Sequence, residues 1–315
     1  TNEMKLTTTQ TFELATRQTI QEQDLLGEFI LNRYPNEGSA KAVVTDLRQL
    51  NLWLQQTYQT DLFDVRATQL GIYRKTLETS GYKVNSINRK LSSIKSWFRY
   101  LAEVGYNKTN KAEYLRLIKN VVKVGTTEAF DLKEVSQLFE SFDTSKGWEL
   151  RNKVICAIMF YCAARVSAVL NLKFDDVVRE ASGLKLRLRE KGGKVRLLHC
   201  NSQVLSPSLL ELIERLPFSS GYIFRGYQKG YGWTEKKLGR QNCYAMVKKQ
   251  TKRLEFDKRL SNHSFRCSFA TAWLDKNYSI DSLKKIGGWA NLDTVKRYDR
   301  NSQEASISEL ELLKI

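Results

Sequence analysis

Apolar residues recur at helical spacing through most of this chain, and only one short stretch alternates strictly. The most legible helical stripe lies in residues 86–103 and consists of Ile87, Leu91, Ile94, Phe98 and Leu101. Since residues three and four apart share a helix face, this stripe predicts one buried side. In residues 184–189 leucine instead alternates with lysine or arginine, and apolar residues return at 195–198 after a glycine turn, which predicts a β-hairpin. The chain is therefore expected to be mainly α-helical with a small β-sheet.

The same patterns divide the 315 residues into two domains, and a chain of this length can hold two cores. Residues 18–106 read as entirely helical, whereas 131–302 combine the hairpin with helices and start with a capping-box-like sequence at Asp131. Residues 107–130 are rich in lysine and are expected to form a basic linker, and residues 1–17 a flexible N-terminus. The helices expected in the second domain are 154–161, 208–216, 235–254 and 264–275.

The bulk charge is strongly positive, because 51 Lys and Arg against 34 Asp and Glu give a net charge of +17. A folded protein with such an excess is expected to bind a polyanion, and nucleic acid is the leading interpretation. A membrane surface fits less well, because no single amphipathic helix concentrates the charge and no run of about 18 apolar residues predicts a membrane span. Five cysteines without metal-binding spacing indicate reduced thiols and hence a cytoplasmic protein.

Four cations interleave with the apolar stripe of residues 86–103, and polar residues stand at its start. A core helix with a solvated basic back explains each single charge equally well, but four on one helix favour a face pressed on phosphates. Two cations on an earlier helix extend that face. The predicted DNA-contacting residues are Lys41, Arg48, Lys83, Ser86, Asn88, Arg89, Lys90, Lys95 and Arg99.

A small cationic cluster near the C-terminus indicates the chemistry. His263 and Arg266 stand three apart and so share a helix face, and Trp289 and Tyr298 follow within a few helical turns. Arg165 lies far upstream among small residues that would let a substrate backbone approach. Each alone has an ordinary explanation as a surface cation or a packing aromatic. Together they form an anion-binding set beside a phenol, which suits attack on a phosphodiester.

The order and spacing of these residues resemble those of the tyrosine recombinases of the phage-integrase, Xer and Cre type. In that family an arginine in a small-residue stretch precedes a hairpin lysine, His-x-x-Arg opens a helix, and a tyrosine follows nine residues after a His or Trp. Residues 263–271, His-Ser-Phe-Arg-Cys-Ser-Phe-Ala-Thr, match the second box of the family, and residues 85–101 resemble its core-binding helical domain. The matching catalytic positions are Arg165, Lys191, His263, Arg266, Trp289 and Tyr298.

The resemblance implies a fold and an assembly. Residues 18–106 would be a SAM-like helical bundle that binds core DNA, and residues 131–302 a mixed α+β catalytic domain. The apolar residues 303–315 would form a helix that docks in a neighbouring protomer. A homotetramer would recombine two double-stranded DNA sites with inverted repeats through a Holliday junction. The chain would come from a prokaryote, phage or plasmid and act at the nucleoid, and no metal, ATP or other cofactor is expected.

The resemblance also implies the roles of single residues. Tyr298 would attack the scissile phosphate with His263 as base, because a phenol titrates only near pH ~10 and needs help. The product would be a 3′-phosphotyrosine. Lys191, with Lys194 as the alternative, would protonate the leaving 5′-oxygen. The non-bridging oxygens would be held by Arg165, Arg266 and Trp289.

The chain departs from the family pattern at Ala168, where an acidic residue usually follows the first arginine at a distance of three. In the family that acid supports the active-site hydrogen bonds. Its absence is compatible with slower turnover, with a substitute from elsewhere in the chain, or with an engineered change. Trp289 replaces the commoner histidine, and an indole N–H donates a hydrogen bond but cannot shuttle a proton. A catalytically weakened DNA-binding protein on the same fold and a relaxing type IB topoisomerase are the alternatives. The complete catalytic set and the preceding helical domain favour a recombinase.

Overall fold

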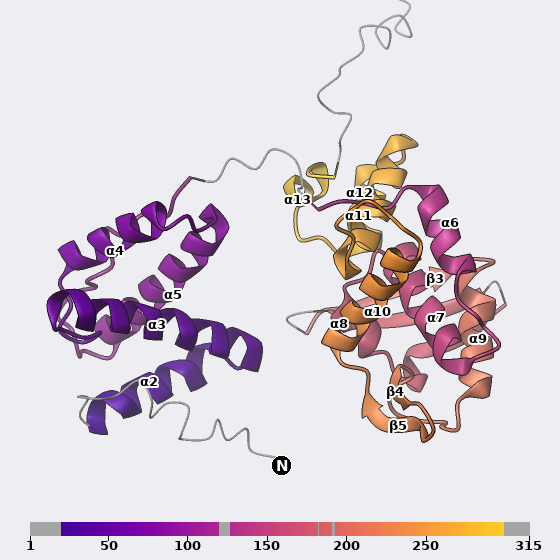
Figure 1. Cartoon of the computed structure of the whole chain (residues 1–315), viewed down its shortest axis with the longest axis horizontal. Coiled ribbons are helices and arrows are strands. Elements are labelled where there is room, and N and C mark those ends of the chain that lie inside the picture. Colours follow the sequence, from indigo (N-terminus) through magenta and orange to yellow (C-terminus); the bar gives the residue numbers. More distant parts are fainter. Residues whose placement is uncertain (1–19, 120–126, 182, 191–192, 299–315) are drawn as a thin grey trace, which may run out of the picture. The chain divides into compact units, whose positions relative to one another are not determined.

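The computed structural model describes residues 20–119, 127–181, 183–190 and 193–298. The chain divides between residues 121 and 122 into two compact units, which we call the first and the second unit (Figure 1). The prediction of a mainly α-helical chain with a small β-sheet is confirmed. No helix in the described ranges is long and apolar enough to cross a membrane.

Four described helices build the first unit around one apolar core. The predicted stripe of residues 86–103 faces this core, where Leu91, Ile94 and Phe98 are fully buried. The side chain of Asn36 accepts hydrogen bonds from the backbone N–H groups of Gly38 and Ser39, which fixes where the second of these helices begins. The helices are α2 (Ile20–Arg33), α3 (Glu37–Tyr58), α4 (Ala67–Thr79) and α5 (Val84–Glu103).

Both described ends of the expected linker 107–130 pack against a unit. Leu115 is buried in the core of the first unit, and Nζ of Lys95 on α5 donates to its carbonyl at 2.8 Å. At the other end, Phe130 is buried in the core of the second unit, where its N–H donates to Ser268 Oγ at 2.7 Å. Residues 120–126 lie outside the described part of the chain.

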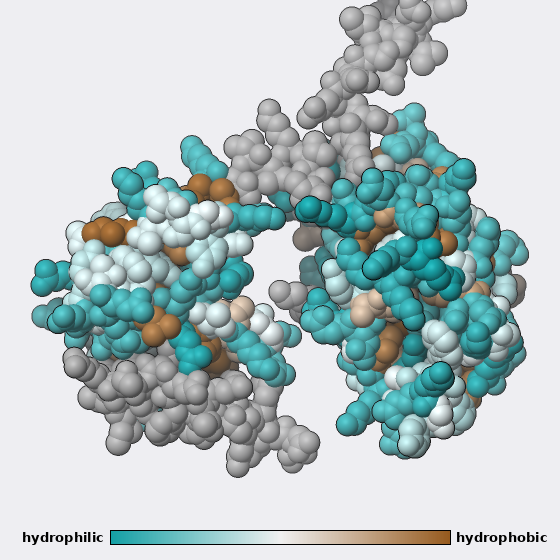
Figure 2. Space-filling view, in the orientation of Figure 1, coloured by the Kyte–Doolittle hydropathy of each residue, from teal (hydrophilic) through white to brown (hydrophobic). Residues whose placement is uncertain are grey.

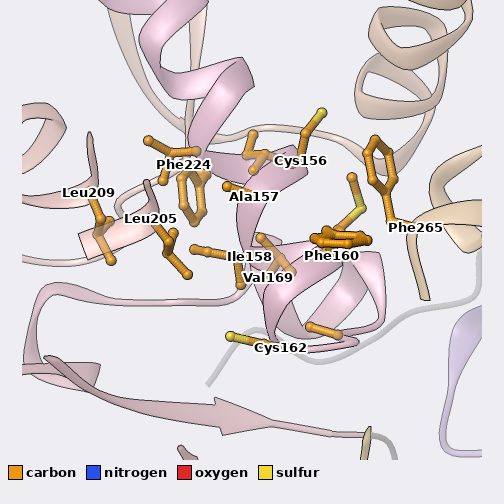
Figure 3. Close-up of a cluster of buried hydrophobic side chains, with 14 of the residues drawn as sticks. Cys156, Ala157, Ile158, Phe160, Cys162, Val169, Leu205, Leu209, Phe224 and Phe265 are labelled. Atoms are coloured by element: carbon orange, nitrogen blue, oxygen red, sulfur yellow. The ribbon is translucent and has the colours of Figure 1, made fainter. Parts of the chain in front are cut away.

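The second unit is arranged around α7 (Gly147–Tyr161), whose residues from Val154 to Met159 are fully buried. A helix that is apolar all round must be covered on every side, and Figure 3 shows side chains of α7 lying among residues that other elements contribute. The predicted buried helix 154–161 is therefore confirmed as the second half of α7. The surrounding helices are α6 (Leu132–Glu140), α8 (Val166–Leu170), α9 (Leu205–Arg215), α10 (Arg240–Arg253), α11 (Asn262–Asp275), α12 (Ile280–Gly287) and α13 (Leu292–Lys296).

The predicted hairpin is confirmed and belongs to a three-stranded antiparallel sheet of β1 (Val177–Glu180), β2 (Gly183–Arg189) and β3 (Val195–Cys200), in that order. β1 follows a 3₁₀ turn at Phe174–Asp176. Alternation along β2 buries its leucines completely or nearly so and leaves its cations at or near the surface, as a one-sided sheet requires. The sheet thereby covers the apolar core with one face.

A second hairpin, β4 (Arg225–Gln228) with β5 (Gly232–Lys237), was not predicted. It corrects the expected helix 235–254, which begins only at Arg240 as α10. Glutamate and lysine at 235–237 favour a helix on propensity alone. Pairing with β4 overrides that preference, because two glycines with positive φ, Gly230 and Gly232, turn the chain back.

All five cysteines are buried and form no disulfide.

Candidate active site

The turn after α7 positions Arg165. The chain leaves the helix through Ala163, which has a left-handed backbone (φ 45°), and the N–H of Ala164 bonds back to the carbonyl of Met159 at 3.1 Å. The chain passes close to other groups at this position, and Ala163 has no exposed surface, so a small side chain is needed there. Arg165 then stands at the cap of α8 with its side chain 42% exposed. The predicted small-residue stretch is therefore a tight reversal that presents one arginine.

The start of α11 carries His263 and Arg266. Ser261 and Ser264 form reciprocal caps at its start. Arg266, only 1% exposed, reaches under the reversal after α7 and donates to the carbonyls of Ala163 and Gly287, the latter at 2.6 Å. Its Nη2 is buried without a hydrogen-bond partner among the described residues. A buried donor left unpaired costs free energy, which makes this atom a natural place for an incoming acceptor.

Trp289 and Tyr298 complete the same cluster. The guanidinium carbon of Arg266 lies 3.8 Å from the ring centroid of Trp289, a close cation–π contact. The ring centroids of Trp289 and Tyr298 lie 5.5 Å apart. The preceding Gly-Gly pair is required by geometry: Gly288 has φ 65°, and a Cβ on Gly287 would lie 1.6 Å from the Trp289 ring. The structure thus brings Arg266, Trp289 and Tyr298 together.

Burial and the neighbouring charges lower the pKa values of two groups in this cluster. Burial and the charge of Arg165 lower the pKa of Arg266 to about 10, so that it remains positive at neutral pH. The pKa of His263 is lowered from its ordinary 6.5, mainly by burial and then by the positive charges of Arg266 and Arg165. His263 keeps part of its surface exposed at the start of α11. Its imidazole is therefore neutral at pH 7 and able to accept a proton.

A carboxylate that the sequence reasoning missed joins two arginines here. Oε2 of Glu190 accepts from Arg165 Nη1 at 2.6 Å, and Oε1 accepts from Arg196 Nη2 at 2.9 Å. The side chains of Glu190 and Arg196 are 6% and 8% exposed, so both charges are buried and paired. Arg196 Nη1 also donates to the carbonyl of Cys162 at 2.8 Å, in the reversal that leads to Arg165.

Arg196 was hidden by its neighbours in the sequence. Val195 and Leu197 look like core residues, but they are 55% and 52% exposed. The strand register pairs Arg196 with Leu188, whose side chain faces the core, so that Arg196 shares the buried face. Had the alternation of β2 been carried across to β3, it would have marked the arginine as inward-pointing.

A pocket of about 640 Å³ opens beside Arg165 and His263. One wall comes from the first turns of α10, which the sequence reasoning did not single out. No group of three His, Cys, Asp or Glu side chains in the described ranges is arranged to hold a metal ion. The lining residues are Ala164, Arg165, Val166, Ser167, Arg240, Gln241, Tyr244, Ser261, Asn262 and His263.

Lys191 lies outside the described residues, as do residues 303–315. Lys194, the alternative hairpin lysine, is exposed at the end of the turn. Its carbonyl accepts from the N–H of Glu190 at 2.7 Å and so closes the described part of the hairpin. The roles of both lysines stay predictions.

Three of the nine predicted DNA-contacting residues already have partners within the first unit, and all nine assignments stay predictions. Lys90 is 6% exposed and binds Asp46 and Gln49 of α3. Lys95 donates to backbone carbonyls of residues 112–115, and Asn88 exchanges two hydrogen bonds of 2.8 Å with the backbone of Ile118. The stripe on α5 showed only which face is apolar, whereas α3 and residues 110–118 cover part of the polar face as well.

The other predicted DNA-contacting residues are exposed or partly exposed to solvent. Lys83 and Arg99 are exposed, and Ser86 and Arg48 are partly buried. Two exposed cations already hold an acid: Lys41 pairs with Glu37, and Arg89 pairs with the fully buried Asp46. On the face shown in Figure 2, hydrophilic residues dominate the surface of each unit.

Comparison with known proteins decides the family. Residues 128–305 match the model of the phage integrase family, and residues 27–105 match that of the phage integrase N-terminal SAM-like domain. The chain belongs to the phage integrase family of tyrosine recombinases. The family predicted from the motifs is thereby confirmed.

Two relatives of this tyrosine recombinase match it over most of its length. It is 28% identical to the tyrosine recombinase XerA of Pyrococcus horikoshii over 288 residues, 90% of this chain and 91% of that protein. It is 25% identical to the TnP I resolvase of Bacillus thuringiensis over 290 residues, 88% and 94% of the two chains.

Two solved structures share its fold. The XerH site-specific recombinase bound to palindromic difH substrate, in a post-cleavage complex, matches with a TM-score of 0.70 and 19% identity over 99% of this chain and 91% of that chain. A lambda integrase dimer bound to a COC′ core site matches with a TM-score of 0.64 and 14% identity over 90% and 78%. At such identities the likeness shows the fold alone.

Proposed function

We propose that this tyrosine recombinase cleaves and rejoins double-stranded DNA at specific sites through a 3′-phosphotyrosine on Tyr298. The observation that carries the proposal is the buried guanidinium of Arg266 beside Trp289 and Tyr298, with one amino group that no described residue pairs. A buried, fixed cation beside a phenol is suited to a phosphate that gains charge as it is attacked. His263, one helical turn before Arg266, supplies a neutral imidazole.

The reaction that these groups would perform is a transesterification. Oη of Tyr298 attacks the phosphorus, its proton passes to His263, and the bond from phosphorus to the 5′-oxygen breaks. Lys191 or Lys194 gives the leaving oxygen its proton. A 5′-hydroxyl from a partner strand then attacks the phosphotyrosine and regenerates the phenol. Arg165, Arg266 and Trp289 hold the non-bridging oxygens throughout.

The DNA would be held by both units. Four of the predicted DNA-contacting cations in the first unit are exposed and can reach phosphates, and the pocket beside Arg165 and His263 offers a place for the DNA backbone in the second unit. We propose that four protomers on two inverted-repeat sites exchange strands through a Holliday junction, with residues 303–315 joining neighbours. The four exposed cations are Lys41, Lys83, Arg89 and Arg99.

The test starts from DNA sites that the protein selects from a random pool. On such a site carrying a nick that traps the cleaved strand, the wild-type chain is expected to form a covalent DNA–protein adduct. Tyr298→Phe should bind the same DNA and form none. Tyr278→Phe is the matched control, because Tyr278 is 52% exposed in the same unit and should leave adduct formation unchanged.

The outcomes separate the alternatives. Adducts formed by Tyr298→Phe would refute the nucleophile, and a wild-type chain that binds without adducts would favour a catalytically weakened DNA-binding protein. A recombination assay on two selected sites distinguishes a recombinase from a type IB topoisomerase-like enzyme. Relaxation of supercoils without recombinant product would favour a type IB topoisomerase-like enzyme.

A further inference from the structure

The carboxylate of Glu190 is the buried acid that meets the first arginine of this site. We propose that Glu190, from the β2–β3 hairpin, positions Arg165 on the scissile phosphate and so takes the place of the acid absent at position 168. This inference rests on the proposed function, because the arginine has a substrate to meet only if the protein cleaves DNA.

Each oxygen of Glu190 serves one arginine. Oε2 holds Arg165 at 2.6 Å and Oε1 holds Arg196 at 2.9 Å, with the carboxylate 6% exposed. Charge-assisted hydrogen bonds of this length fix direction as well as distance. Because 42% of the Arg165 side chain is exposed, little else restrains its guanidinium among the described residues.

The second arginine closes a loop around the site. Arg196 Nη1 donates to the carbonyl of Cys162, three residues before Arg165, so Glu190 is tied to both ends of the reversal that carries the arginine. The N–H of Glu190 also bonds the carbonyl of Lys194 across the hairpin turn at 2.7 Å. One carboxylate therefore sets the spacing between the hairpin and the start of α8.

Ala168 shows why the acid must come from the hairpin. It is 1% exposed and packs in the main apolar core of the second unit, so the side of α8 that carries it offers no polar group to Arg165. Three arginines, Arg165, Arg196 and Arg266, influence one another here, and the negative charge of Glu190 opposes their repulsion. Without it, the exposed arginine would turn to solvent.

The experiment compares single-turnover cleavage by Glu190→Gln and by wild type on the nicked substrate, at saturating protein and well below the unfolding temperature. Glutamine keeps the shape and removes the charge. The cleavage rate constant is expected to fall about 10- to 100-fold while the DNA dissociation constant changes less than about twofold, since the arginine is displaced rather than removed. Glu214→Gln is the matched control, because Glu214 pairs with Arg179 on the surface at 2.8 Å and should change neither value.

A second substrate separates positioning from a merely structural role. A methylphosphonate at the scissile position replaces one charged oxygen by a methyl group and lessens the need for a cation. If Glu190 acts through Arg165, the loss caused by Glu190→Gln shrinks on this substrate. Glu190→Asp, which keeps the charge, should recover part of the rate.

Three results would overturn the inference. One is a cleavage rate constant of Glu190→Gln equal to that of wild type. Another is a loss confined to the amplitude of the cleavage reaction, which reports the fraction of protein that is folded. The third is an equal loss on both substrates. In these cases wild type still forms adducts and the proposed function stands, whereas a wild-type chain without adducts refutes both.

Discussion

Gly287→Ala tests whether the contact between Trp289 and the end of α12 builds the active site. Gly287 is the last residue of α12, and the three atoms nearest to an added Cβ all belong to the indole ring of Trp289. An alanine Cβ would lie 1.6 to 2.3 Å from three ring carbons, so the ring must move. That ring supports the guanidinium of Arg266, which also bonds the carbonyl of Gly287.

Two opposing terms set the expected stability change. Replacing a helical glycine by alanine stabilises by about 0.5–1 kcal/mol through backbone entropy. Forcing a packed ring aside costs about 1–3 kcal/mol. The net expectation is a destabilisation of about 0–2.5 kcal/mol, centred near 1 kcal/mol. Because a displacement near 1 Å at a reacting group costs about 100-fold in rate, cleavage should fall about 10- to 100-fold.

The assay measures thermal unfolding and single-turnover adduct formation on the same preparation. Gly71→Ala is the matched control, because Gly71 lies inside α4 with nothing within 4 Å of an added Cβ and should be stabilising with wild-type cleavage. If Gly287→Ala unfolds at or above the wild-type temperature and cleaves at the wild-type rate, the contact between the Trp289 indole and Arg266 is not required for stability or cleavage.

Three further predictions concern other parts of the molecule. Since the pKa of His263 is lowered, cleavage that needs its neutral form should persist at pH 6.5 and fall only at lower pH, and His263→Gln should lose this acid limb in a pH–rate profile. Arg99→Ala should reduce the slope of log K for DNA binding against log salt by about 1, whereas Lys95→Ala, which removes the same charge from the same helix, should leave the slope and lower the unfolding temperature. An equal slope change in the two variants would contradict the inward placement of Lys95. Ala168→Glu should destabilise the second unit by about 2–4 kcal/mol, since it buries a carboxylate in an apolar core, and an unchanged unfolding temperature would show that the new acid finds a partner.

The sequence predicted the helices with the clearest apolar stripes and the hairpin. The stripe of α5 and the alternation of β2 reflect burial on one side of one element, a local property that spacing records. The helix expected at 235–254 failed at its start because β5 pairs with β4, and pairing between strands is not visible in either strand alone. The partners of Lys90 and Lys95 within the first unit were not visible for the same kind of reason, since other segments supply them.

For the candidate active site, the sequence by itself singled out Arg165, His263, Arg266, Trp289 and Tyr298, because their residue types and spacing match a family motif. Only the tertiary structure decided how they are held. The acid that meets Arg165 comes from Glu190 on another element, and its second partner Arg196 is buried where its neighbours look like core residues. A hydrogen bond between side chains 25 residues apart depends on where the sheet and α8 pack, which no local pattern encodes.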